Sequence, residues 1–130
     1  MKKILLLFSF LLILVVTSCS SGDEPDGKKD YYVKYELSAS YPGRVGVPTN
    51  IVINTDTGTK ELTVGYTWEA VYGPVSKGFE ALLEVPEQEY TQYRSNCTIR
   101  ISVSKNTEPF SVKAEQSAKR QSMRISYIIE

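Results

Sequence analysis

The chain has 130 residues and balances 15 Lys and Arg against 15 Asp and Glu, so its formal net charge is zero. This length predicts one domain, and the even charge argues against a nucleic-acid partner, which requires clustered excess Lys and Arg. The sequence contains no His, which excludes the Ser-His-Asp triad, the Cys-His dyad and the HExxH zinc site.

The first 18 residues have the pattern of an export signal. Lys2 and Lys3 precede an apolar run from Ile4 to Val16 that only Ser9 interrupts. This run is shorter than the roughly 20 residues of a membrane-spanning helix, and its length is typical of a signal peptide. We therefore predict that residues 1–18 are a signal peptide.

The residues that end this run resemble a bacterial lipobox. In Val16-Thr17-Ser18-Cys19 an aliphatic residue and two small residues precede a cysteine. The resemblance implies cleavage before Cys19 and acylation of its thiol, which anchors a protein to a membrane without a spanning helix. An ordinary secretory signal, with Cys19 merely close to the cleavage site, is the alternative.

The residues after Cys19 predict the location of the protein and a tether. Ser20 stands where an inner-membrane retention signal would have Asp, which favours the outer membrane, on either its periplasmic or its surface face. Asp23-Glu24 resembles the acidic segment of surface-exported lipoproteins of the Bacteroidetes. Residues 20–30 contain no aliphatic or aromatic side chain, so they cannot bury surface to offset the entropy of ordering. Residues 19–30 are therefore expected to be a lipidated, flexible tether.

From Tyr31 onward, apolar and polar residues alternate with the period of a β-strand. We expect seven strands, separated by breaks such as Asp56-Thr57-Gly58 and Gly73-Pro74, with residues 87–96 as the longest loop. Residues 31–130 are thus predicted to form an all-β domain, a seven-stranded antiparallel immunoglobulin-like β-sandwich, with a small up-and-down or partly open barrel as the alternative. The expected strands cover residues 31–39, 50–55, 62–68, 79–85, 97–104, 110–114 and 123–129.

The strand pattern also resembles a known family, the MmpS-like transport accessory proteins. The resemblance implies a small exported β-sandwich held at a membrane, where it assists a large efflux-type transporter. The chain departs from that family in having a lipid-anchor signal in place of an N-terminal transmembrane helix. It also lacks a second cysteine near the C-terminus that could pair with Cys97. The resemblance rests on Tyr35-Glu36-Leu37, the turn at Gly58, Thr67-Trp68, Gly78-Phe79-Glu80-Ala81-Leu82 and Cys97-Thr98-Ile99-Arg100-Ile101.

Cys97 lies on the apolar side of its expected strand, beside Ile99 and Ile101. Free cysteines are among the most buried residue types, so we predict a buried, unreactive thiol. A reactive thiol or an intermolecular disulfide is the alternative.

Four aromatic residues are the candidates for binding: Trp68, Tyr72, Tyr90 and Tyr93. Tyr90 and Tyr93 fall in the longest loop, and Tyr72 falls beside the expected Gly73-Pro74 break. Loop tyrosines can form a flat amphipathic surface for a protein or a sugar ring. The alternative is a role in the core or at strand ends, since Trp68 shares a face with apolar neighbours.

The leading functional prediction is a non-catalytic cell-envelope lipoprotein that binds or assists another envelope protein, such as a transporter. A carbohydrate-binding or adhesion module is the alternative. An enzyme would have to use Glu84, Glu87 and Glu89 around Pro86, but carboxylates beside a loop are usually solvated, and no cleft is evident from the sequence. We expect no catalytic residue, no metal and no cofactor.

Overall fold

The computed structural model describes residues 29–130, so the predicted signal peptide, Cys19 and residues 19–28 of the predicted tether lie outside the described residues. The described chain forms two antiparallel four-stranded sheets with one short 3-10 helix, η1, at Thr91–Tyr93. None of its helical segments has the length and apolar character that a bilayer crossing requires.

In the first sheet the strand order is β4 (Thr67–Ser76), β1 (Lys29–Ser40), β6 (Asn96–Lys105) and β7 (Ser111–Ala118). In the second sheet it is β3 (Gly58–Val64), β2 (Thr49–Thr55), β5 (Glu80–Val85) and β8 (Met123–Ile128).

The hydrophobic core lies between the two sheets, as the period-two alternation predicts. Alternate residues in the middle of β1 and along β6 are buried in one core with residues of β2 and β5, which confirms the expected inward face of both strands. Each such Val, Leu or Ile side chain stabilises the fold by roughly 1.5–3 kcal/mol. The arrangement is therefore a β-sandwich-like all-β fold. Its central residues are Val33, Leu37, Ile51, Ile53, Leu83, Ile99 and Ile101.

Tyr35 joins the two sheets through its hydroxyl group. The side chain projects from β1 and is fully buried. Its hydroxyl donates a hydrogen bond to the carbonyl of Asn54 (2.6 Å) and accepts one from the amide of Leu82 (3.2 Å). Burial raises the pKa of Tyr35 above its usual range, so the neutral phenol is the form that the fold retains.

The structure has eight strands rather than the predicted seven. The expected strand 62–68 is divided, because β3 ends at Val64 and β4 begins at Thr67 in the other sheet. The amide of Ala39 fixes this corner by donating to the carbonyl of Tyr66 (2.6 Å). The predicted break at Gly73-Pro74 is also wrong, since both residues lie within β4.

A β-bulge changes the face that β7 presents. The alternation of apolar residues predicts that Val112 and Ala114 share one face, but the pairing with β6 shifts register between Ile101 and Ser102. Ala114 is opposite the inward-facing Ile101, whereas Val112 is opposite Ser102 and is 56% exposed. The extra residue, Lys113, places the two side chains on opposite faces of the sheet.

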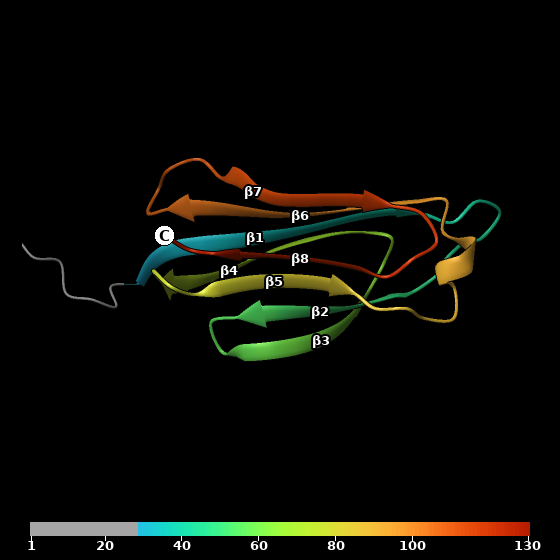
Figure 1. Ribbon diagram of the computed structural model, residues 1–130, viewed down its shortest axis with the longest axis horizontal. Coiled ribbons are helices and arrows are strands. Elements are labelled where there is room, and N and C mark those ends of the chain that lie inside the picture. The colour runs from blue at the N-terminus through green and yellow to red at the C-terminus, as the bar shows by residue number, and fades with distance from the viewer. Residues whose placement is uncertain (1–28) are drawn as a thin grey trace, which may run out of the picture.

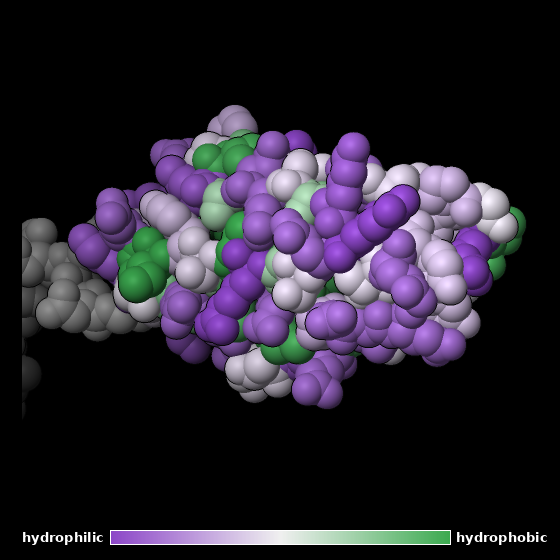
Figure 2. Space-filling view, turned by 45° about the vertical axis from the view of Figure 1, so that its right-hand side comes forward, coloured by the Kyte–Doolittle hydropathy of each residue, from purple (hydrophilic) through white to green (hydrophobic). Residues whose placement is uncertain are grey.

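The loops divide between the two ends of the sandwich, as Figure 1 shows. β1 begins at Lys29 at one end, and the loops formed by residues 41–48 and 86–95 lie at the other, which we call the distal end. In the face drawn in Figure 2, hydrophilic side chains predominate and the apolar residues form separate spots. That face therefore has no large continuous apolar patch of the kind that marks an obligate interface.

Candidate functional site

The structure separates the four predicted binding aromatics into two pairs. Tyr90 and Tyr93 lie in the loop of residues 86–95 at the distal end. Trp68 and Tyr72 lie in β4 and pack against the core, where the ring centroids of Tyr72 and Tyr35 are 6.1 Å apart. Tyr72 is thus a strand residue rather than a neighbour of a turn. The four side chains do not form one surface.

At the distal end, an arginine lies over the two loop tyrosines. The guanidinium carbon of Arg44 is 3.8 Å from the ring centroid of Tyr93 and 5.6 Å from that of Tyr90. Such cation–π contacts contribute about 0.5–1 kcal/mol each at exposed positions. Val45, the next residue, is 94% exposed. We call Arg44, Val45, Tyr90 and Tyr93 the distal site.

Two glycines hold Arg44 and Val45 at the tip of their loop. Gly43 and Gly46 have φ angles of +74° and +70°, in the left-handed region that favours glycine. The loop is closed at its base by Tyr41, which is buried and whose carbonyl accepts a hydrogen bond from the amide of Arg44 (3.0 Å). The sequence Pro42-Gly43-Arg44-Val45-Gly46 indicates a turn that exposes its central residues, but Arg44 was not among the predicted binding residues.

The loop that carries the two tyrosines is fixed to β2. Gln88 makes a pair of hydrogen bonds with the backbone of Asn50: its Oε1 accepts from the amide (2.7 Å) and its Nε2 donates to the carbonyl (3.2 Å). The amide of Gln88 donates in turn to Oγ1 of the buried Thr91 (2.9 Å). These contacts position η1, with Tyr90 directly before it and Tyr93 as its last residue.

Arg94 follows η1 and is fully buried, although residues 87–96 have the pattern of a loop. Its Nη2 donates to the carbonyl of Gln121 in the turn between β7 and β8. Within the described residues, Nε and Nη1 have no hydrogen-bond partner. The buried guanidinium also lies close enough to Cys97 to lower the pKa of that thiol, although burial, the larger effect, raises it.

Cys97 is fully buried and forms no disulfide among the residues that the structure covers. It belongs to the core cluster with Ile99 and Ile101, so the predicted buried position is confirmed. Because burial raises the pKa of its thiol, the reactive thiolate is disfavoured at neutral pH.

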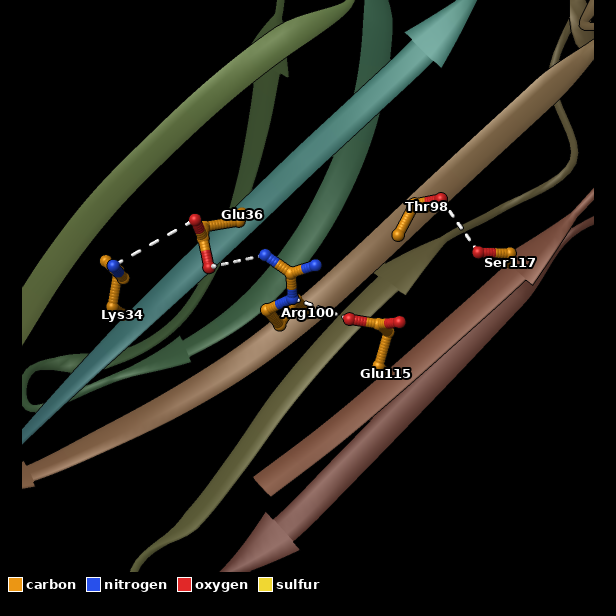
Figure 3. Close-up of polar contacts among 6 residues, drawn as sticks. All are labelled: Lys34, Glu36, Thr98, Arg100, Glu115 and Ser117. Carbon is orange, nitrogen blue, oxygen red and sulfur yellow. Dashed lines mark hydrogen bonds and ion pairs between the residues drawn. The ribbon is translucent and has the colours of Figure 1, made fainter. Parts of the chain in front are cut away.

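The outer face of the first sheet carries a second group of polar side chains (Figure 3). Arg100 on β6 lies between Glu115 on β7 (Nε–Oε2, 2.6 Å) and Glu36 on β1 (Nη1–Oε2, 3.7 Å). Lys34 approaches Glu36 from the same strand (3.9 Å), and the hydroxyls of Thr98 and Ser117 are 2.7 Å apart. Apart from the Lys34–Glu36 pair, these contacts join neighbouring strands of the sheet.

The three glutamates considered for catalysis do not converge on a cleft. Glu84 lies in β5, with a carboxylate oxygen 3.9 Å from Nη1 of Arg124, and Glu87 and Glu89 are exposed in the following loop. Across residues 29–130, no three His, Cys, Asp or Glu side chains are grouped so that they could hold a metal ion.

Comparison of the chain with protein-family models, curated proteins and solved structures finds no match.

Proposed function

We propose that the chain is a non-catalytic lipoprotein of the bacterial cell envelope that binds another envelope protein through the distal site. The observation that carries the proposal is the guanidinium of Arg44 lying 3.8 Å over Tyr93, beside a valine that is 94% exposed. Tyr and Arg dominate the binding energy of protein interfaces, because they combine apolar area with hydrogen-bonding groups. An exposed valine adds apolar surface that association would remove from water.

The distal site is organised before any partner arrives. The two glycines and Tyr41 define one loop, and Gln88 attaches the other to β2. A surface whose side chains are already ordered loses less conformational entropy on association than a flexible one. This pre-organisation supports a binding role over a purely structural role for the tyrosines.

The charge of Arg44 indicates the chemistry of the partner. Within residues 29–130 its side chain contacts the two tyrosine rings, and no ion pair engages it. Its planar set of N–H donors matches a carboxylate, which can accept two of them at once. We infer that the partner presents an Asp or Glu side chain next to an apolar contact for Val45.

A lipid at Cys19 would orient the distal site relative to the membrane. The tether would join the sandwich at Lys29, at the opposite end of the long axis from the distal site (Figure 1). The site would then face away from the lipid attachment point and towards proteins in the same compartment.

We also propose that the sandwich is immunoglobulin-like and that the membrane is the outer membrane. The resemblance to MmpS-like proteins favours a transporter as the partner.

Site-specific photo-crosslinking in the native cells tests this proposal. A photoreactive amino acid in place of Val45 should give one dominant protein adduct, and Arg44→Ala in the same chain should reduce its yield several-fold. The matched control carries the photoreactive group at Val112, an exposed valine on the outer face of β7, and should not give that adduct. Equal adducts from both positions, or none from Val45, would contradict the proposal.

A further inference from the structure

Two rows of polar side chains cross the outer face of the first sheet next to each other. Cross-strand pairing aligns Thr67, Ser38, Thr98 and Ser117 in one row. The neighbouring row, two residues along each strand, contains Glu69, Glu36, Arg100 and Glu115. Residues two apart on a strand share a face, so a row of hydroxyls borders a row of charged groups. A hollow of about 360 Å³ lies over both rows where β4, β1 and β6 are adjacent.

On the β6 side of the hollow, most polar groups already have partners. Arg100 contacts both Glu36 and Glu115, and the hydroxyl of Thr98 is hydrogen-bonded to that of Ser117 (Figure 3). These contacts hold the guanidinium in a fixed position beside the hollow.

On the β1 and β4 side, the polar groups are uncommitted. Among the described residues, no hydrogen bond or ion pair engages the side chains of Ser38, Thr67 or Glu69, all of which line the hollow. Glu69 is also directly opposite Glu36, and like charges in that position are destabilising. The hollow therefore offers two free hydroxyls and one free carboxylate beside a fixed arginine.

Trp68 also borders the hollow, but its side chain lies on the other face of the sheet. It is paired with the inward-facing Leu37 and packs against the core, and successive residues of a strand point to opposite faces. The groups that the hollow offers to a ligand are therefore the polar side chains of the outer face.

The combination of these groups selects one class of ligand. A metal cation is disfavoured because Lys34 and Arg100 already compensate Glu36, which leaves Glu69 as the one uncompensated carboxylate of the hollow, and an anion would meet the carboxylates. A hydroxyl of a sugar both donates to a carboxylate and accepts from Ser, Thr or Arg, so adjacent sugar hydroxyls can engage all the free groups. The volume is at the lower end of the roughly 300–1,000 Å³ of ligand pockets. We propose that the hollow binds one neutral hexopyranose ring, independently of the distal site.

Saturation-transfer NMR on the full chain, in a detergent without sugar groups, tests this assignment. The probes are the methyl glycosides of glucose, galactose, mannose and N-acetylglucosamine. At least one should receive saturation from the protein. The double variant Thr67→Val with Glu69→Gln should weaken its binding about tenfold or more, since a hydrogen bond to a charged group is lost.

The matched control is Glu61→Gln with Thr63→Val, which changes the same residue types at the same spacing on β3 of the second sheet. It should bind as the unmodified chain does. Unfolding midpoints of all variants check that the sandwich is retained, and Glu69→Gln alone, an exposed substitution, provides a second test. The proposal is overturned if none of the four glycosides receives saturation. It is also overturned if the hollow variants bind normally or the control variant loses binding to the same extent.

Discussion

At the scale of single residues, two fully buried polar side chains differ in whether their hydrogen-bonding groups have partners. The hydroxyl of Tyr35 is engaged by one backbone acceptor and one backbone donor of the second sheet. Arg94 is equally buried, but two of its nitrogens have no hydrogen-bond partner in the described chain. A buried polar group that is fully hydrogen-bonded fixes the packing around it, whereas an unsatisfied one reduces stability by its full desolvation penalty. Tyr35 should therefore stabilise the sandwich, and Arg94 should not.

The pKa of Tyr35 predicts a loss of stability at alkaline pH. Burial raises this pKa above the ordinary value of 10.0, so from about pH 10 upward the unfolded state releases its proton while the folded state keeps it. The contribution is fully present below about pH 10, and above it the free energy of unfolding should fall by about 1.4 kcal/mol per pH unit. Burial also raises the pKa of Cys97, so the measurement is made in a Cys97→Ala background.

Urea unfolding at several alkaline pH values gives this slope. Tyr35→Phe in the same background should be less stable at neutral pH, because two buried hydrogen bonds are lost, and should show a shallower alkaline slope. The two slopes are compared directly, since all other titrating groups are common to both chains. An identical slope in the Phe variant would mean that Tyr35 is not the group responsible.

Two substitutions of Arg94 separate charge from volume. Arg94→Met keeps an unbranched apolar chain and removes the unsatisfied guanidinium, so the free energy of unfolding should stay the same or rise by up to about 4 kcal/mol. Arg94→Ala also removes the charge but leaves a void, and we expect a loss of roughly 2–5 kcal/mol. Urea unfolding at neutral pH distinguishes them. If the Met variant is destabilised as strongly as the Ala variant, the guanidinium makes contacts that the chain depends on.

At the scale of strands, the close approach of β4 to β1 at Gly73 requires a glycine. Its φ angle is +138°, and an added Cβ would lie 2.8 Å from the carbonyl oxygen of Tyr31. Gly73→Ala should therefore lower the free energy of unfolding by roughly 2–4 kcal/mol, from backbone strain and this overlap together. Gly78 also has a positive φ, of +89°, but an added Cβ meets no atom within 4 Å.

Gly78→Ala is thus the matched control for conformational strain alone, with an expected loss of roughly 1–2 kcal/mol. Urea unfolding of both variants gives the difference that the steric overlap contributes. Equal losses in the two variants would show that β1 moves away from the added methyl group without lowering the free energy of unfolding.

Strand periodicity predicts which face of a strand is buried better than it predicts the sheet to which the strand belongs. The alternation in β1 and β6 identified their buried apolar residues, because one side of each strand contacts the core. It was wrong for Ser102 and Ser104 on the other side of β6, which are buried as well, Ser102 opposite Val112 of β7 and Ser104 with its hydroxyl donating to the carbonyl of Glu108. The same alternation continues from Leu62 through Trp68 although the chain changes sheets between them. A corner of this kind is set by a distant contact, the hydrogen bond from Ala39 to Tyr66, which no local pattern contains.

The candidate sites show the same limit. That Tyr90 and Tyr93 lie in a loop followed from the sequence, but their contact with Arg44 requires two distant loops to meet at one end of the sandwich. The hollow requires β4, β1 and β6 to be neighbours in that order. Sequence patterns report local conformation and burial, whereas both sites are products of strand order.

At the scale of the whole molecule, the two proposed sites have different orientations. The distal site lies at the end of the long axis opposite Lys29, whereas the hollow lies on the outer face of the first sheet, alongside that axis. With a lipid at Cys19, the end of the domain would face away from the membrane and the sheet face would lie to one side. A protein partner and a sugar could therefore be bound at the same time without competing for surface.

The proposed anchor predicts that membrane attachment and folding are separable. Cys19 lies outside the described sandwich, whereas Cys97, the other cysteine of the chain, is in its core. Cys19→Ser, expressed behind a signal peptide that is cleaved without acylation, should therefore move the protein from the detergent phase to the aqueous phase in Triton X-114 partitioning, with an unchanged free energy of unfolding for residues 29–130. An acyl chain contributes about 0.8 kcal/mol per buried CH₂, so its loss removes most of the membrane affinity. Cys97→Ala is the control: it should lower stability and leave partitioning unchanged. If Cys19→Ser still partitions into detergent, the attachment lies elsewhere in the chain, and the distal site loses the orientation assigned to it.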